Sequence, residues 1–439
     1  MSLNVKRVLT LLLVFGAGTL RAQTVGNSPY SVLGIGDLYS PGFIPSAGMG
    51  GLGVSNANGF HVNHVNPALL ARSRIAFFEA GMFLHFKGLT EGERTQQVRS
   101  GNINYLSFAF PAGRRWSLGL SLMPYSRVDY TSRSTSLLFR GITDFNIVNY
   151  TYRGTGGITQ ANLTNGWNVL NTYRSDPKDP TKRLLQQSLY AGLEATFLFG
   201  NINREATSEI QTGSGGNNEV AFTERTNVTD FTFKPGLAYQ LRLKDRLYLN
   251  AVATYTFAAD VNAKRLTTLQ RRDALEQPVT IDTLEDLTGG SLFLPSQYQF
   301  GLSLESPFRW TVGADVTYQP WSKYQAFGVN GELSDTYQVS VGGEFTPDPN
   351  SISSYFKRAT YRLGANYAQL PYNVNGQQLN DRSVSLGTSL PMARGFSDLN
   401  LSFALGQRGT NGPIQENYFK VFLGFTLRDN QWFLKRKID

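Results

Sequence analysis

The sequence predicts an all-β fold: a transmembrane antiparallel β-barrel of about 14 strands, with an N-terminal plug in its lumen. The first observation behind this prediction is period-two alternation. It is clearest where apolar side chains occupy every second position, at Trp310, Val312, Ala314, Val316 and Tyr318. The two end aromatics are roughly 20 Å apart in a tilted strand, close to the ~25 Å apolar band of outer-membrane barrels. Such segments recur about a dozen times, which indicates that lipid covers the apolar face.

The strands are expected from residue 75 onward. A soluble β-sandwich is the alternative architecture, but its polar face is in contact with water and is usually richer in Lys and Glu. Here the polar positions hold mainly Gly, Ser, Thr, Asn and Gln, which fits a wet lumen. The most regular segments are 76–85, 116–122, 189–197, 247–255, 310–318, 361–367 and 419–427.

The second observation is an alternation in the length of the connections. Short turns are expected at 111–115, 243–246 and 305–309, and we interpret the long polar excursions between them as outer loops, at about 131–157, 205–218, 261–293 and 323–335. An even number of strands then leaves both termini in the periplasm. Two periplasmic connections, near 171–187 and 347–358, are unusually long.

Composition excludes several classes of protein. The absence of cysteine excludes a disulfide framework and a lipid anchor on cysteine. A mean hydropathy of −0.24 excludes a helical membrane bundle. The formal charge is +9 and falls to +6 once Lys6, Arg7 and Arg21 leave with the leader. A small excess scattered over strands and turns predicts no nucleic-acid partner.

Residues 1–22 have the pattern of a secretory signal peptide. Lys6 and Arg7 precede a short apolar stretch, and Ala22 offers a small residue for cleavage. An N-terminal anchor helix is the alternative, although the stretch is shorter than the ~20 residues that span a bilayer. A secreted chain of this pattern is expected in the outer membrane of a Gram-negative bacterium, as an integral barrel.

Residues 23–74 are rich in Gly and Asn and show little alternation. Irregular backbone is tolerated at membrane depth only inside protein or in a wet cavity, so this segment is predicted to be the plug. The barrel would then span residues 75–428 and a periplasmic tail residues 429–439. Trp432 and Phe433 in the basic tail suggest either docking to a periplasmic partner or a hairpin that closes the barrel base.

No residue pattern predicts catalysis. His61 and His64 are three residues apart, but two imidazoles without a third ligand make a poor zinc site. We prefer the interpretation that these plug residues form hydrogen bonds with lumen carboxylates such as Glu79. The sequence therefore predicts no enzyme, no metal and no cofactor.

Pro124 interrupts a strand directly after a regular run. Proline removes a ladder donor and is normally confined to edges and bulges, whereas a barrel has no edge. One interpretation is a kink that opens a lateral window for an apolar solute. The other is that Pro124 already lies above the membrane.

The excursion at 131–157 contains a cluster of apolar residues. Exposed apolar patches of this kind usually bind something, and we regard this one as a candidate outer-loop capture patch. Mutual packing of these side chains as a cap on the barrel is the alternative. The residues are Leu137, Leu138, Phe139, Phe145 and Ile147.

Several motifs, in this order, resemble the FadL/OMPP1/TodX family of outer-membrane transport proteins. The N-terminal segment ends in Asn66, Pro67, Ala68 and Leu69 just before the first strand. The other motifs are Tyr152–Gly157, Leu294-Pro295, Trp310, Asp315, Tyr318, Trp321-Ser322, Tyr361–Gly364 and Tyr418–Leu427. The resemblance spans essentially the whole mature chain.

This resemblance implies a fourteen-stranded barrel with an N-terminal hatch and a gap at a kinked third strand, where Gly119 and Pro124 lie. It also implies passive uptake of hydrophobic small molecules, namely long-chain fatty acids or aromatic hydrocarbons. The alternative is a non-transporting barrel subunit of an outer-membrane secretion or assembly complex. Expected partners are membrane lipid and a hydrophobic ligand, with a possible protein partner at the outer loops or the tail.

Overall fold

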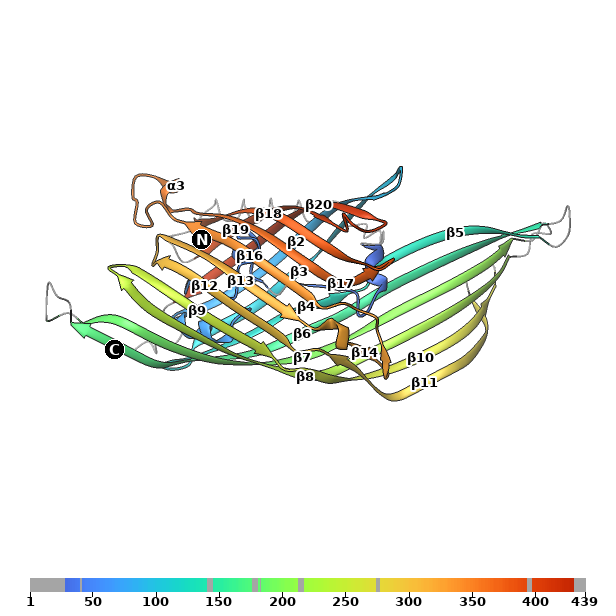
Figure 1. Ribbon diagram of the computed structural model, residues 1–439, viewed down its shortest axis with the longest axis horizontal. Helices are drawn as coiled ribbons and strands as arrows, with labels where there is room; N and C mark the ends of the chain where they lie inside the picture. Colours follow the sequence, from blue (N-terminus) through green and yellow to red (C-terminus); the bar gives the residue numbers. More distant parts are fainter. Residues whose placement is uncertain are drawn as a thin grey trace, which may run out of the picture.

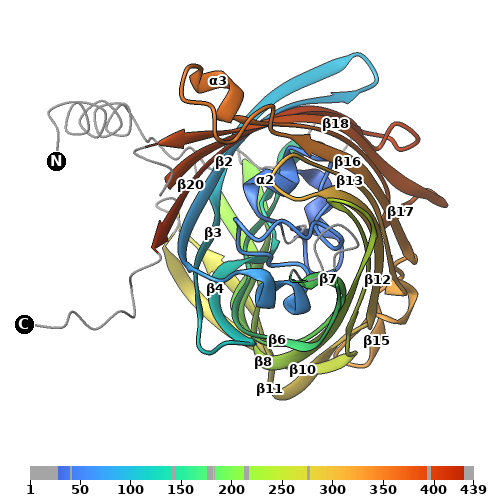
Figure 2. The same ribbon diagram turned by 90° about the vertical axis from the view of Figure 1, so that its left-hand side faces the viewer.

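The computed structural model describes residues 28–429, except 40–41, 140–144, 176–180, 182, 212–216, 274–276 and 393–396. The expected signal peptide and almost all of the expected tail lie outside the described residues. The described chain forms a closed antiparallel barrel with its N-terminal segment inside the lumen (Figures 1 and 2). The prediction of a plugged all-β barrel is confirmed.

Fourteen strands form the wall, and β20 pairs with β2 to close it. Every neighbouring pair in the wall is antiparallel. The strands are β2 (Ala76–Glu91), β3 (Arg94–Pro111), β4 (Trp116–Arg127), β6 (Phe145–Ser175), β7 (Arg183–Gln211), β8 (Asn217–Lys244), β9 (Leu247–Thr256), β12 (Gln297–Ser306), β13 (Trp310–Gln319), β16 (Thr336–Phe345), β17 (Thr360–Val374), β18 (Gln377–Met392), β19 (Ser397–Arg408) and β20 (Gln415–Asp429).

The two faces of the wall differ as the alternation predicts. In β2, Phe78, Met82 and Leu84 are exposed on the outside, whereas Glu79 and His85 are buried on the lumen side. The same separation recurs around the barrel, and rows of stacked aromatics such as Tyr298, Tyr318 and Tyr337 lie on the outer face. This continuous apolar exterior is the surface that a bilayer covers. Among the described residues, no helix is both long and apolar enough to cross a bilayer.

The wall extends far beyond the membrane on the side opposite the short turns. Strands β6, β7 and β8 have 31, 29 and 28 residues, whereas about 9–11 residues cross a bilayer. Strands β5 (Tyr130–Phe139), β10 (Ala259–Arg272) and β11 (Pro278–Leu294) widen this extension by pairing with β6, with β8 and with each other. We call these six strands above the membrane the extracellular wall (Figure 1).

The interpretation of the long excursions as loops is therefore wrong for most of 131–157, 205–218 and 261–293. They are paired strands above the membrane whose outer face meets water, so they lack the lipid-facing apolar row that identifies a membrane strand. The excursion at 323–335 is irregular, apart from the end of η3 (Trp321–Lys323) and two short strands, β14 (Gln325–Ala326) and β15 (Val329–Asn330). The connection at 347–358 contains the short helix α3 (Tyr355–Arg358).

The plug has little regular structure. It contains η1 (Pro29–Val32), β1 (Asp37–Leu38), α2 (Ile44–Ala47) and η2 (Pro67–Arg72), joined by irregular backbone inside the ring of strands (Figure 2). Its apolar side chains are buried against the wall; Ile44, Met49, Leu52 and Leu70 are fully enclosed.

The wall meets the plug through lumen-facing glycines, which we call the glycine belt. A Cβ atom on Gly364 would lie 2.0 Å from the carbonyl carbon of Met49, and one on Gly192 would lie 2.3 Å from the amide nitrogen of Ala68. Any side chain at these positions would collide with plug backbone, so the fit depends on glycine. The belt consists of Gly81, Gly166, Gly192, Gly236, Gly342, Gly364, Gly387 and Gly424.

Candidate functional site

The ladder between β3 and β4 is much shorter than either strand. It runs from Pro111–Ser117 to Leu106–Leu122 and then stops. Above this point β3 still pairs with β2 as far as Arg94, and β4 still pairs with β6 as far as Arg127. In the described part of the chain, no strand pairs with the β4-facing edge of β3 above Leu106. This interval is a lateral gap in the hydrogen-bonded wall.

The plug closes the gap from inside. Strand β1 pairs with the upper end of β4 through Asp37–Arg127 and Leu38–Ser126. The next residue, Tyr39, donates its backbone N–H to the Tyr125 carbonyl at 3.0 Å. On the β3 side, the Asn104 amide donates to the Gly42 carbonyl at 3.1 Å. Tyr39 and Gly42 of the plug therefore contact the two separated edges, one each.

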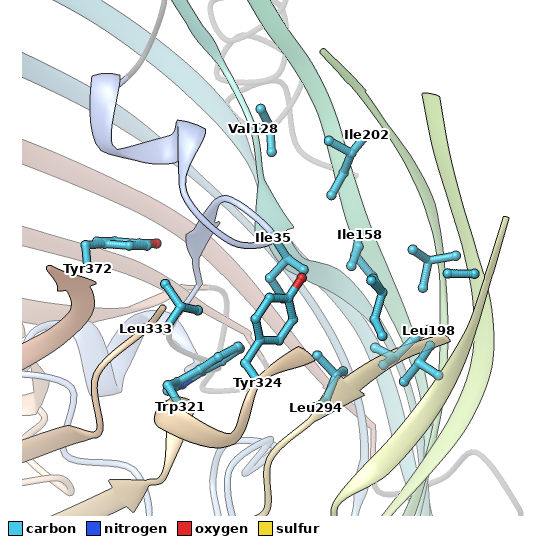
Figure 3. Packing of buried hydrophobic residues seen from close by; sticks show 14 of the residues in the cluster. Ile35, Val128, Ile158, Leu198, Ile202, Leu294, Trp321, Tyr324, Leu333 and Tyr372 are labelled. Atoms are coloured by element: carbon cyan, nitrogen blue, oxygen red, sulfur yellow. The ribbon is translucent and has the colours of Figure 1, made fainter. Parts of the chain in front are cut away.

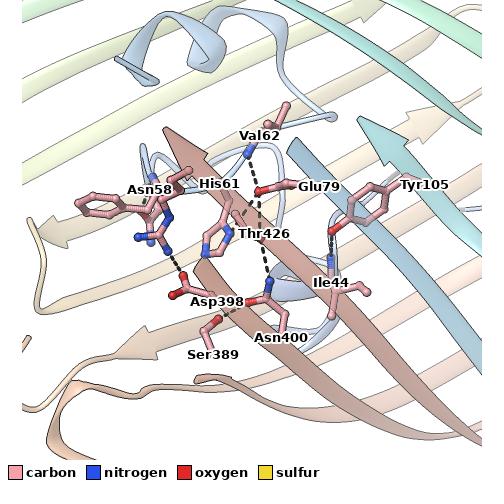
Figure 4. Close-up of polar contacts among 12 residues, drawn as sticks. Ile44, Asn58, His61, Val62, Glu79, Tyr105, Ser389, Asp398, Asn400 and Thr426 are labelled. Atoms are coloured by element: carbon pink, nitrogen blue, oxygen red, sulfur yellow. Dashed lines mark hydrogen bonds and ion pairs between the residues drawn. The ribbon is translucent and has the colours of Figure 1, made fainter. Parts of the chain in front are cut away.

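Apolar packing completes this closure. Phe43 and Ile44 of the plug form one buried cluster with Tyr105 of β3 and Met123 of β4. The Ile44 N–H donates to the Tyr105 hydroxyl at 3.3 Å (Figure 4). The closing side chains are therefore apolar or aromatic, and they present an apolar environment at the gap.

Pro124 lies at a register shift between β4 and β6, directly above the last β3–β4 pair. A bulge accommodates a residue that lacks a ladder donor. Gly119 lies lower in β4, opposite Ala109 and Thr164. A Cβ atom there would lie 3.1 Å from the Leu70 side chain of the plug. The structure thus places Pro124 at the gap and Gly119 against the plug below it.

The motif Asn66-Pro67-Ala68 joins the plug to the wall. The Asn66 side chain caps η2 by accepting the Ala68 N–H at 3.0 Å. Gly192 and Gly236 approach Pro67 so closely that a Cβ atom on either would clash with it. The three residues therefore fix the last part of the plug against β7 and β8.

A carboxylate of the wall binds the middle of the plug. Asp315 of β13 accepts the backbone N–H groups of Gly53, Val54 and Ser55 at 2.8, 2.7 and 3.0 Å. Three charge-assisted hydrogen bonds to consecutive amides fix that segment strongly. Sequence analysis found Asp315 only as a polar position of a regular strand and as part of the resemblance.

Partly and fully buried ion pairs tie down the first part of the plug. Asp37 of β1 pairs with Arg408 of β19 at 3.0 Å, and Arg408 also pairs with Asp381 at 3.1 Å. Ser28 donates to Glu416, which pairs with Lys87 at 3.2 Å. Removing one member of such a pair leaves a buried charge without a partner. Sequence reasoning missed these residues, because an inward charge on one strand does not reveal its partner.

A large apolar cluster lies in the lumen around the first part of the plug. Figure 3 shows residues from the plug, the wall and the segment 321–333 meeting in one buried cluster, including Ile35, Val128 and Ile158. Tyr125 and Leu38, which flank the upper gap, pack against this cluster. The cluster therefore reaches from the extracellular wall to the gap.

An exposed apolar row continues the cluster upward on the lumen-facing side of the extracellular wall. Tyr152, Phe222 and Leu269 lie on the same side as the buried Val228, and Ala206 connects them through direct cross-strand pairs. Their side chains are 37–46% exposed. We call these three residues the apolar shelf. Their dispersion over three strands hides the shelf from any one-dimensional pattern.

The predicted capture patch lies in the β5–β6 hairpin. Leu137 pairs with Ile147 on the side of the sheet facing away from the lumen, and Leu137 is half exposed. Leu138, Phe139 and Phe145 belong to the same paired strands, and their side chains lie outside the described part of the structure.

The two plug histidines lie in different surroundings. The Nδ1 atom of His61 is 3.5 Å from a Glu79 oxygen, which also accepts the Val62 N–H (Figure 4). His64 stacks near Tyr105, and its burial together with the charge of Lys234 lowers its pKa to about 3. No group of three or more His, Asp or Glu residues suited to a metal occurs among the described residues.

A closed barrel with an apolar exterior and a lumen plug defines an integral outer-membrane β-barrel protein. The chain belongs to the BamG family, whose model matches residues 4–439. No curated protein matches it.

Among solved structures, the chain is similar to the toluene transporter TbuX of Ralstonia pickettii, with 14% identity and a TM-score of 0.50, covering 88% of this chain and 98% of TbuX. It is also similar to the toluene transporter TodX of Pseudomonas putida, with 16% identity and a TM-score of 0.50, covering 90% and 99%. A TodX variant, deltaS2, gives a TM-score of 0.54 at 16% identity. These similarities confirm the fold that the resemblance implies.

Proposed function

We propose that this protein is a passive conduit through which hydrophobic small molecules leave the lumen sideways between β3 and β4. The observation that carries the proposal is the early end of the β3–β4 ladder at Leu106–Leu122, below a wall that continues on both sides. Long-chain fatty acids and aromatic hydrocarbons are the candidate substrates. The similarity of the fold to toluene transporters supports aromatic hydrocarbons as substrates.

The route would begin at the apolar shelf. A solute captured by Tyr152, Phe222 and Leu269 meets the buried apolar cluster directly below them. We place capture there rather than at Leu137 and Ile147, because that pair faces away from the lumen. Straight descent is blocked by the plug, which touches the glycine belt around the barrel. The gap is then the exit that needs the least rearrangement, and no catalytic step is involved.

Passage requires β1 and the closing residues Phe43 and Ile44 to move, which gives a direct test. Leu38 and Ser126 are paired positions of β1 and β4, and antiparallel partners are about 4.5–5.5 Å apart at Cα, within disulfide range. The natural chain has no cysteine, so Leu38→Cys/Ser126→Cys introduces the only pair. We expect oxidation to abolish uptake of labelled oleate and toluene by cells producing the variant, and reduction to restore it.

The matched control is Leu363→Cys/Leu386→Cys, which links two outward positions already paired in the wall. Oxidation of this pair should leave uptake unchanged. Full uptake by the completely oxidised Leu38→Cys/Ser126→Cys variant would contradict a route that depends on plug movement near β4.

A second candidate function is that of a structural subunit in an outer-membrane secretion or assembly complex. The extracellular wall favours it: 31 residues of β6 extend about 100 Å, much more than a membrane crossing needs. Extraction in mild detergent followed by native mass spectrometry distinguishes the two. A stoichiometric protein that is lost when the β10–β11 segment 265–287 is deleted supports the subunit, whereas a single chain carrying a hydrophobic ligand supports the conduit.

A further inference from the structure

The periplasmic end of the barrel contains a cavity that the proposed transport route does not use. It lies below the plug, opens between the short turns and α3, and has a volume of about 1370 Å³ (Figure 2 looks toward this end). Pockets for small ligands usually measure about 300–1,000 Å³. The size and the position favour a macromolecular segment arriving from the periplasm. We call this cavity the periplasmic vestibule.

The charges of the vestibule are separated between its floor and its rim. Six arginines and four carboxylates line it. The three floor carboxylates are already paired: Glu305 with Arg72 at 2.8 Å, Glu344 with Arg362 at 3.0 Å, and Asp398 with Arg428. The floor is therefore close to neutral.

The rim is cationic. Arg74, Arg246, Arg309 and Arg358 are exposed there and form no ion pair with a described residue, while Asp348 is the one rim carboxylate among the described residues that line the cavity. Asp245, next to Arg246 in the same turn, pairs with Arg242. Arg74 donates to the Arg114 carbonyl, and Arg358 lies over the Tyr355 ring. Guanidinium groups without a carboxylate partner favour an anionic ligand.

Aromatic rings lie between the rim and the floor. The Phe60 ring of the plug packs against the Phe308 ring of the β12–β13 turn, with centroids 5.3 Å apart. The Arg428 guanidinium lies 5.2 Å from the Phe60 ring centre. Phe308 remains 65% exposed beside Phe60, so this pair leaves apolar surface open to the cavity.

Two rim turns hold Phe308 and Arg246 in a strained backbone conformation. Phe308 has φ +68° and Arg246 has φ +59°, in tight turns where Gly or Asn would be relaxed. At the opposite end, the β17–β18 turn uses the relaxed solution Asn375-Gly376, whereas Phe327 and Glu332 of the irregular segment 323–335 also have positive φ. Bulky residues in this conformation are strained, and such residues tend to occur at functional sites.

We propose that the periplasmic vestibule is a receptor for an acidic polypeptide segment that carries an aromatic side chain. Carboxylates of the segment pair with the rim arginines, above all Arg246 and Arg309. Its aromatic ring packs on Phe60 and Phe308. The partner is a periplasmic protein, and this interaction is independent of solute transport.

The test uses the full chain in nanodiscs and three labelled probes: a glutamate-rich peptide with one tryptophan, its lysine-rich counterpart, and a fluorescent fatty acid. Fluorescence anisotropy should show binding of the acidic peptide, weakening with salt. In Arg246→Glu/Arg309→Glu, we expect acidic-peptide affinity to fall by roughly tenfold or more and lysine-peptide affinity to rise. The control Arg133→Glu/Arg271→Glu reverses two exposed charges of the extracellular wall and should change neither affinity.

Phe308→Asn separates a binding role from a structural one. Asparagine tolerates positive φ, so the variant should be at least as heat-stable as the natural chain. It should nevertheless bind the tryptophan-containing peptide several-fold more weakly than the natural chain does. It should bind an otherwise identical peptide without tryptophan as tightly as the natural chain does. The proposal is overturned if the natural protein binds the glutamate-rich and lysine-rich peptides equally or binds neither. It is also overturned if only the fatty acid binds and its binding depends on Arg246 and Arg309, or if Phe308→Asn leaves the affinity for the tryptophan-containing peptide unchanged.

Discussion

Gly192→Leu is expected to displace the end of the plug and open the lumen. Even a Cβ atom at this position would lie 2.3 Å from backbone atoms of Pro67 and Ala68, and backbone cannot yield as a flexible side chain can. Neighbouring Gly166 and Gly236 touch the same segment, so the plug cannot shift sideways along the wall. Overpacking of this kind typically costs about 1–3 kcal/mol, and more where backbone is hit.

Two measurements check this result. Planar-bilayer recordings should show larger and more frequent conductance steps than the natural protein gives, and hydrogen exchange should accelerate in residues 66–72. Gly289→Leu is the matched control, because a Cβ atom on Gly289 meets nothing within 4 Å. Natural conductance and exchange in Gly192→Leu would mean that the plug is not held at the glycine belt.

Asp315→Ala is expected to release the middle of the plug. The substitution leaves the buried N–H groups of Gly53, Val54 and Ser55 without an acceptor, and each such orphan costs about 1–3 kcal/mol. Hydrogen exchange at these three amides should increase strongly, and the barrel should unfold at a lower temperature in a heat-modifiability assay. Asp315→Asn keeps one acceptor oxygen. Its hydrogen exchange and its unfolding temperature should lie between those of the natural chain and those of Asp315→Ala.

The control for this prediction is Asp286→Ala, which removes an exposed carboxylate from β11. It should leave the unfolding temperature and plug exchange unchanged. If Asp315→Ala behaved like Asp286→Ala, the three hydrogen bonds would not contribute to plug stability.

The membrane strands were predictable because lipid imposes a strict rule on them. Every lipid-facing position must be apolar and every second position faces the lumen, so 76–85, 310–318 and 419–427 reveal both their strand character and their orientation. Above the membrane both faces of β6, β7 and β8 meet water or lumen. The alternation then fades, and the excursions looked like loops although they continue the same ladders.

The plug was predictable as an irregular segment but its attachments were not. Gly and Asn enrichment in 23–74 indicates backbone without regular pairing, and exclusion from lipid places it in the lumen. The partners of its charges and amides come from strands hundreds of residues away, as with Asp37 and Arg408. Pro124 was a local signal, but that β4 leaves β3 at Leu122 is a property of two strands.

By itself, the sequence determined the barrel, the sidedness of its strands and the presence of a plug, because the bilayer acts on each strand locally through one repeated requirement. Only the tertiary structure decided where the β3–β4 ladder ends and which residues of the wall bind the plug. It alone also decided that arginines from separate turns meet around one periplasmic cavity. Those features depend on register and closure, which bring together residues that no local pattern connects.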